Sequence, residues 1–168
     1  MKTTNYVVTF IVLSIAAAIS GMAVATGLNP STVYANHEFA ANLTGQQEVP
    51  PVDTQATGHT ILVQNLPQNQ TVHYFVNVTG IQGATQGHIH SGVEGENGPI
   101  VVTLFNFDSP QSEVFEKGNI TASNLEGPMQ GKTIPDLIAA MKNGSTYVNV
   151  HTEQNPNGET RGQLVDIP

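Results

Sequence analysis

Apolar and polar residues alternate in short stretches through most of the chain after about residue 38. A period of two is typical of a β-strand with one buried face, and these stretches are rich in β-branched and aromatic residues. Residues 67–70 (PQNQ) separate two of the clearest stretches and predict the turn of a hairpin. The segments that we expect to form strands are 39–43, 58–66, 71–79, a stretch around 88–90, 100–105, 147–152 and 162–165, with weaker ones at 114–115 and 119–122.

One segment has the pattern of a helix instead. Residues 134–144 follow Thr133, a good N-cap residue, carry Pro135 in the first turn and end at Gly144. Eight or so short strands with a single short helix predict an all-β fold, an antiparallel, Greek-key-like β-sandwich or flattened barrel.

Two histidines share one face of an expected strand. In the segment 87–90 (GHIH), His88 and His90 point to one side and Ile89 to the other, because successive side chains on a strand alternate. The segment 147–152 (YVNVHT) repeats this pattern and places His151 on a polar face. If the two strands are neighbours, the three imidazoles converge.

Three neutral nitrogen donors suit zinc or copper, whereas magnesium and calcium prefer oxygen ligands. The sequence therefore predicts a metal site at His88, His90 and His151. The alternative is that each is an ordinary surface or hydrogen-bonded histidine. Because Ile89 faces the core, the three rings should lie outside it, and the loops 91–99 and 153–160 are the candidates to cover them.

The first part of the chain is expected to lie outside this domain. Lys2 precedes an apolar run from residue 6 to residue 25, as in a secretory signal. Small residues allow cleavage after Ala25 or Ala35, and we favour Ala35 because strand-like alternation begins only near residue 39. The alternative is an uncleaved N-terminal membrane anchor. The predicted organisation is a leader at 1–35 and a folded domain at 36–168, secreted or otherwise extracytoplasmic.

The amino-acid composition excludes some metal ligands and argues against one class of partner. The chain has no cysteine, so it can form neither disulfides nor thiolate–metal bonds. Its net charge of −8 argues against nucleic acid as a partner, because phosphate binding needs clustered Lys and Arg. Any resident metal must therefore depend on histidine and carboxylate ligands.

Several motifs together resemble the CHRD domain, named after chordin. They are 43–51 (LTGQQEVPP), 87–90 (GHIH), 97–102 (NGPIVV), 147–152 (YVNVHT) and 155–164 (NPNGETRGQL), and the resemblance covers about residues 38–166. The sequence departs from the family pattern at Gly87, where Ala is usual, and at Thr160, where Ile is common. The resemblance implies a secreted β-sandwich module, which in chordin belongs to an extracellular antagonist of growth factors.

The segment GHIH is also similar to the copper strand of copper-zinc superoxide dismutases, which have a later histidine ligand and an arginine near the metal. By that analogy His88, His90 and His151 hold copper, with zinc as the alternative, and Arg161 attracts a small anionic oxidant such as superoxide. The alternative for Arg161 is a structural ion pair with Glu48 or Glu159.

Other residues could complete such a site. His73 is the best reserve for a fourth ligand, while His37 and His59 are too scattered to form a separate zinc site. Glu48, Asn149 and Glu159 are candidates to orient the imidazoles, because a ligating histidine usually donates its second N–H to a carboxylate or carbonyl.

Three functions remain open on the sequence. The chain is a copper-dependent, superoxide dismutase-like enzyme, a copper-binding or storage protein without turnover, or a metal-free adhesion or signalling module. They are distinguished by metal content and by the effect of replacing the histidines.

Overall fold

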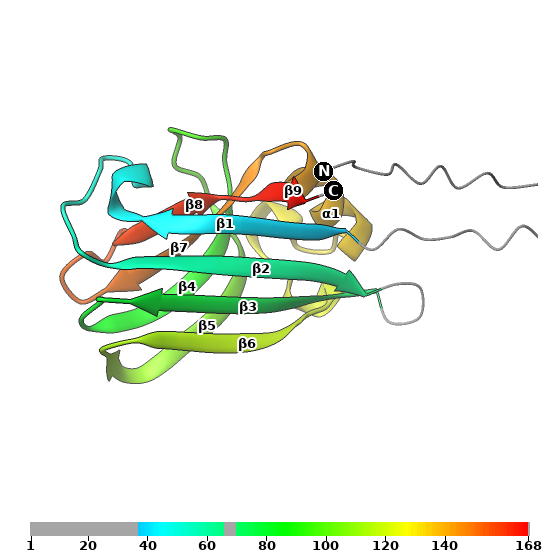
Figure 1. Cartoon of the computed structure of the whole chain (residues 1–168). Coiled ribbons are helices and arrows are strands. Elements are labelled where there is room, and N and C mark those ends of the chain that lie inside the picture. Colours follow the sequence, from blue (N-terminus) through cyan, green and yellow to red (C-terminus); the bar gives the residue numbers. More distant parts are fainter. Residues whose placement is uncertain (1–36, 66–69, 168) are drawn as a thin grey trace, which may run out of the picture. The chain divides into compact units, whose positions relative to one another are not determined.

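A computed structural model describes residues 37–65 and 70–167 (Figure 1). The expected leader or anchor at 1–35 lies outside these residues. Within the described part, no helix combines the length and hydropathy needed to cross a lipid bilayer.

The described chain is almost entirely antiparallel β-structure with one α-helix. Its elements are β1 (Glu38–Thr44), η1 (Gly45–Gln47), β2 (Thr57–Asn65), β3 (Thr71–Thr79), β4 (Ala84–Ser91), β5 (Ile100–Gln111), β6 (Val114–Ile120), η2 (Ala122–Asn124), η3 (Gly127–Met129), α1 (Ile134–Lys142), β7 (Thr146–Thr152), β8 (Thr160–Gln163) and β9 (Val165–Ile167). The prediction of an all-β antiparallel sandwich or flattened barrel with one short helix is confirmed.

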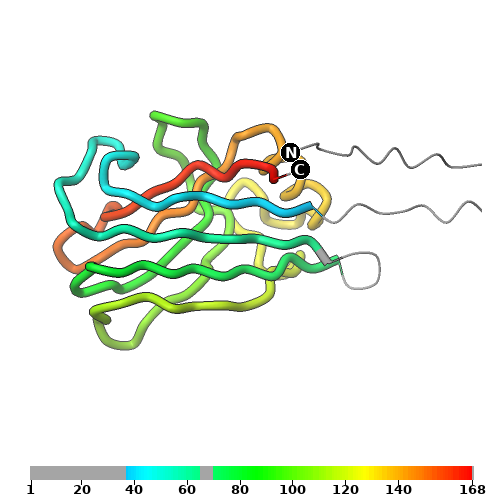
Figure 2. The backbone as a smooth tube through the Cα atoms, in the orientation of Figure 1, coloured from blue at the N-terminus to red at the C-terminus, as the bar shows by residue number. Residues whose placement is uncertain are grey.

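The strands form one curled sheet in the order β5-β4-β7-β8-β1-β2-β3-β6, and β9 pairs with β1. The two ends of this order, β5 and β6, are separated along the chain only by residues 112–113. Such a short connection requires the sheet to bend round until its edges approach, as the chain path in Figure 2 shows. In Figure 1, β1, β2, β3 and β6 accordingly form one layer in front of β4, β5 and β7.

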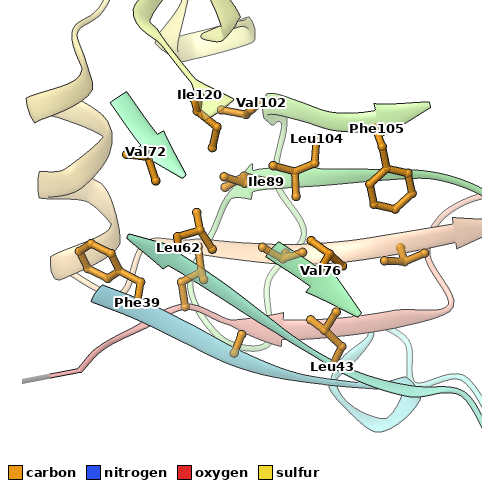
Figure 3. Close-up of a cluster of buried hydrophobic side chains, with 14 of the residues drawn as sticks. Phe39, Leu43, Leu62, Val72, Val76, Ile89, Val102, Leu104, Phe105 and Ile120 are labelled. Carbon is orange, nitrogen blue, oxygen red and sulfur yellow. The ribbon is translucent and has the colours of Figure 1, made fainter. Parts of the chain in front are cut away.

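Apolar side chains from both layers fill the space between them. Phe39, Leu62 and Val76 from one layer meet Ile89 and Leu104 from the other (Figure 3). Ile89, Val148 and Val150 are fully buried, which confirms that this face of β4 and β7 is packed against the core. The helix α1 begins with a capping box between Thr133 and Asp136 and buries one apolar side.

Two expected boundaries were wrong. The weak strands at 114–115 and 119–122 fall in one strand, β6, except for residues 121–122, which lie beyond its end, and β6 pairs continuously with β3 from Val72↔Ile120 to Val78↔Val114. β5 likewise extends to Gln111, because it follows β4 through several register shifts as far as the pair Ala84↔Gln111. Long-range pairing of this kind holds polar segments extended where local sequence signals are weak.

Candidate metal centre

His88, His90 and His151 come together on the side of β4 and β7 that faces away from the core. The two strands are antiparallel neighbours, with His88 opposite Asn149 and His90 opposite Tyr147. His151 is opposite Gln86, so it is the diagonal neighbour of His88 on the same face. The pairing that the sequence could only suppose is therefore present.

The three rings lie close enough to share one ion. One ring nitrogen from each histidine lies within 4.8 Å of the corresponding atoms of the other two. The shortest approach is 2.9 Å, between Nδ1 of His88 and Nε2 of His151. Among the described residues, this is the one group of three or more potential metal-binding side chains.

Backbone carbonyls determine which nitrogens of His90 and His151 carry protons. His90 donates its Nδ1–H to the carbonyl oxygen of Gly98 at 2.8 Å, and His151 donates its Nδ1–H to that of Pro156 at 3.0 Å. In a neutral imidazole the other nitrogen, Nε2, then has a free lone pair. This arrangement is the usual support of a metal-ligating histidine.

The second ring nitrogen of His90 is available to bind an ion. This atom, Nε2, is buried and has no hydrogen-bond partner. His151 Nε2 accepts a hydrogen bond from His88 Nδ1, so a metal ion in the centre would require His88 to carry its proton on Nε2 instead. A neutral histidine can make this exchange without any change in charge.

Burial also keeps the imidazoles uncharged. Removal from water lowers the pKa of all three below the ordinary value of 6.5, in His88 to about 3 with a further contribution from the two neighbouring rings. Neutral imidazoles are the form that binds metal, so the centre needs no deprotonation at neutral pH.

Loops cover the histidines, as the sequence suggested. The three side chains are only 3%, 8% and 5% exposed although they point away from the core. Gly98 belongs to the loop 91–99 and Pro156 to the loop 153–160, and each loop supplies the carbonyl that orients one ring. The loops therefore both shield and position the centre.

A buried stack that the sequence did not reveal supports His90. The Tyr147 ring lies nearly parallel to the His90 ring at 4.9 Å between centroids, and the guanidinium carbon of Arg161 lies 3.5 Å from the centre of the same tyrosine ring. The Tyr147 hydroxyl accepts a hydrogen bond from the backbone N–H of Gly98. The only sequence signal was that Tyr147 shares the polar face of its strand with His151.

Arg161 is fully buried and holds the covering loop. It donates hydrogen bonds to Asn97 Oδ1 at 3.1 Å and to the carbonyl oxygens of Val93 and Glu96 at 3.0 and 2.8 Å. Its charge acts on His90, whose pKa it helps to lower, after burial as the main cause.

Neither expected ion-pair partner is bonded to Arg161. The described residues include no salt bridge from Arg161 to Glu48 or Glu159. Glu159 instead accepts hydrogen bonds from Thr54, Thr152 and Asn155. Burial raises its pKa, but these bonds outweigh burial and leave the pKa below its ordinary value. Glu159 thus stabilises a loop junction, and its carboxylate is occupied away from the imidazoles.

Glu48 and Asn149 are closer to the centre. Glu48 Oε1 and Asn149 Oδ1 are both buried without a hydrogen-bond partner. Burial raises the pKa of Glu48 to about 7, against the opposing effects of Arg161, Asn149 and the backbone of Val49. Asn149 also raises the pKa of His90, so its side chain lies close to both titratable groups.

The remaining histidines lie elsewhere. His73 is on β3, separated from β7 in the sheet by β8, β1 and β2, and its ring hydrogen-bonds Asn119. His59 contacts the ring of Phe75, and His37 lies near Asp166. None joins the three clustered rings, so the expectation that His73 is a reserve fourth ligand was wrong. Strand position alone could not reveal this, because it does not specify sheet order.

Comparison with known proteins shows the family to which the sequence of this chain is similar. The family model of the CHRD domain matches residues 39–164. Chordin of Xenopus laevis is 30% identical over 145 residues, which are 83% of this chain but only 14% of the length of that protein. No solved structure matches the chain.

Proposed function

This chain belongs to the CHRD domain family, and from that premise and the geometry of its three histidines we propose that it is an extracytoplasmic copper-binding protein with superoxide dismutase-like activity. The proposed ligands are His88, His90 and His151, with zinc as the alternative ion. The convergence of three buried ring nitrogens within 4.8 Å of one another is the observation that carries the proposal, because it is the one such group of potential metal ligands among the described residues.

The donor set supports this chemistry. Copper(II) has the highest affinity of the common divalent metals for nitrogen ligands, and three imidazoles leave a coordination position open. A bound copper ion would supply one-electron redox chemistry, by which two superoxide ions and two protons become oxygen and hydrogen peroxide. The protein would supply neutral ligands held by Gly98 and Pro156 and a shield from bulk solvent.

Arg161 contributes to the proposed reaction through its charge and its loop contacts. Its guanidinium lies on Tyr147, which stacks on His90, so a positive charge acts close to the centre. We assign it the attraction of a small anion such as superoxide, together with positioning of the loop 91–99.

Metal analysis of the full chain, expressed without a polyhistidine tag, tests the binding site. We expect one copper per chain and an electron paramagnetic resonance spectrum typical of nitrogen ligands. His88→Ala and His151→Ala should lose both, while His73→Ala, on another part of the sheet, should keep both. Absence of stoichiometric copper, or full retention in His88→Ala, would overturn the proposal.

Superoxide consumption tests turnover separately. We expect the copper-loaded chain to exceed the same concentration of free copper and His88→Ala not to do so. Arg161→Lys keeps the charge but cannot reproduce the planar set of donors, so a loss of activity with copper retained would assign the residue to positioning.

A copper-binding protein without turnover would bind the metal and remain at the level of free copper. The family membership supports a metal-free interaction module as a further candidate. In that case the histidine variants would lose stability alone.

A further inference from the structure

A small cleft lies beside the histidine centre. It has a volume of about 250 Å³ and is lined by residues 48–52 on one side and 154–158 on the other. Pro156, whose carbonyl oxygen accepts the Nδ1–H of His151, forms part of one wall. Glu48 forms part of the other wall.

The loop 91–99, which also covers the centre, is held by several hydrogen bonds. Arg161 donates to three acceptors in the loop 91–99, and Asn97 of this loop donates to the carbonyl oxygen of Val49 at 2.6 Å. By contrast, no hydrogen bond in the described chain joins residues 48–52 to residues 154–158. The two walls of the cleft are therefore joined less firmly than the loop 91–99 is joined to the rest of the domain.

Glu48 lines the cleft although its side chain is almost completely buried. Glu48 is only 5% exposed, and its Oε1 atom is inaccessible to solvent and has no partner. A Cβ atom built on Gly158 would lie 2.3 Å from this oxygen and 2.7 Å from Asn149 Nδ2, so the three residues are in close contact. His90 Nε2 is equally inaccessible. Glu48 thus lines the cleft while its Oε1 atom lies inside the protein, next to Gly158 and Asn149.

We propose that this cleft is the entrance through which water and inorganic molecules of two or three heavy atoms reach the histidine centre, and that the Glu48 side chain is its gate. The cleft has room for several water molecules, since each occupies about 30 Å³. It is smaller than the sites of about 300–1,000 Å³ that hold larger organic ligands. This inference rests on the proposed metal site and specifies the size of its substrates.

Access can be measured on the copper-loaded full chain with two probes. Water is followed by the relaxation of its protons by the bound ion, and azide by the absorption band that it gives on binding copper. Glu48→Ala should open the entrance and raise both the water relaxation and the azide association rate several-fold. Asn157→Trp, at an exposed position that lines the cleft, should lower both several-fold.

Two controls separate bulk from charge and from general effects. Glu48→Gln keeps the size of the side chain and should stay close to the parent protein. Gln130→Trp adds the same ring at an exposed position outside the cleft and should change neither probe. The resonance spectrum of copper should be the same in all variants, because none removes a ligand.

The outcomes distinguish the two proposals. A chain that binds no stoichiometric copper overturns both. Copper binding with probes that ignore Glu48→Ala and Asn157→Trp overturns the entrance alone, and Asn157→Trp decides the question even if Glu48→Ala does not fold. Equal effects of Glu48→Gln and Glu48→Ala would overturn the role of the side chain as a gate, because they would assign the effect to its charge.

Discussion

Glu48 is a buried carboxyl group whose protonation is linked to folding. Burial raises its pKa from 4.5 to about 7. The free-energy cost of removing the charged form from water exceeds the stabilisation of that form by Arg161, Asn149 and the Val49 backbone. Below pH 4.5 the group is neutral in both the folded and the unfolded chain. As the pH rises to about 7, the unfolded chain ionises first, so the folded state loses relative stability, and above that pH the loss stays constant.

Glu48→Gln should remove this pH dependence. We expect the free energy of unfolding of the variant, relative to the parent chain, to rise by up to roughly 3 kcal/mol between pH 4.5 and 7, since one pKa unit corresponds to about 1.4 kcal/mol. Urea unfolding across this range, on the metal-free protein, measures it. Glu94→Gln, at an exposed carboxyl group, is the matched control. A difference that does not vary with pH would contradict the explanation.

At the scale of elements, β4 contributes side chains to the core on one face of the sheet and to the histidine centre on the other. Ile89 packs into the core, while His88 and His90 point to the covered face. Gly87 belongs to the same strand and allows a close approach of β5: a Cβ atom there would lie 2.4 Å from a ring carbon of Phe105. The ring of Phe105 therefore packs where any larger residue of β4 would place its Cβ atom.

Gly87→Ala should therefore destabilise this chain although alanine is otherwise well tolerated in a strand. We expect a loss of about 1–2 kcal/mol from overpacking against Phe105, measured by urea unfolding. Gly87→Ala should cost less stability when it is introduced into the Phe105→Leu variant than when it is introduced into the parent chain. Equal effects of Gly87→Ala in both backgrounds would show that the ring is not responsible.

For the whole molecule, the centre connects parts that are distant along the chain. β4 and β7 supply the three rings, the loops 91–99 and 153–160 supply the carbonyls, and Arg161 of β8 holds the first of these loops. A metal ion bound there would hold these segments together in the folded state, whereas the unfolded chain has no such site.

Copper should therefore stabilise the domain as a unit. At a free concentration one hundred times the dissociation constant, we expect the free energy of unfolding to rise by about 2.7 kcal/mol. Thermal unfolding with and without Cu(II) measures this, and a chelator should reverse the increase. His88→Ala should abolish the increase, and His59→Ala, which lies on β2, should retain it. A similar stabilisation of His88→Ala would indicate that the metal binds elsewhere.

The sequence alone determined the all-β class, the single helix and the placement of His88 and His90 on one face with Ile89 on the other. These features follow from local periodicity and turn residues, which are properties of neighbouring positions. It also indicated the two covering loops, because their glycines and prolines interrupt the strands on either side of the histidines.

Only the tertiary structure decided which strands are neighbours, and with them the composition of the site. The pairing of β4 with β7 brings His151 to the other two rings, while the position of β3 keeps His73 away. The stack of Arg161 on Tyr147 and the burial of Glu48 likewise depend on contacts between segments far apart in sequence. Periodicity states which way a side chain points, but it carries no information on which distant strand lies beside it.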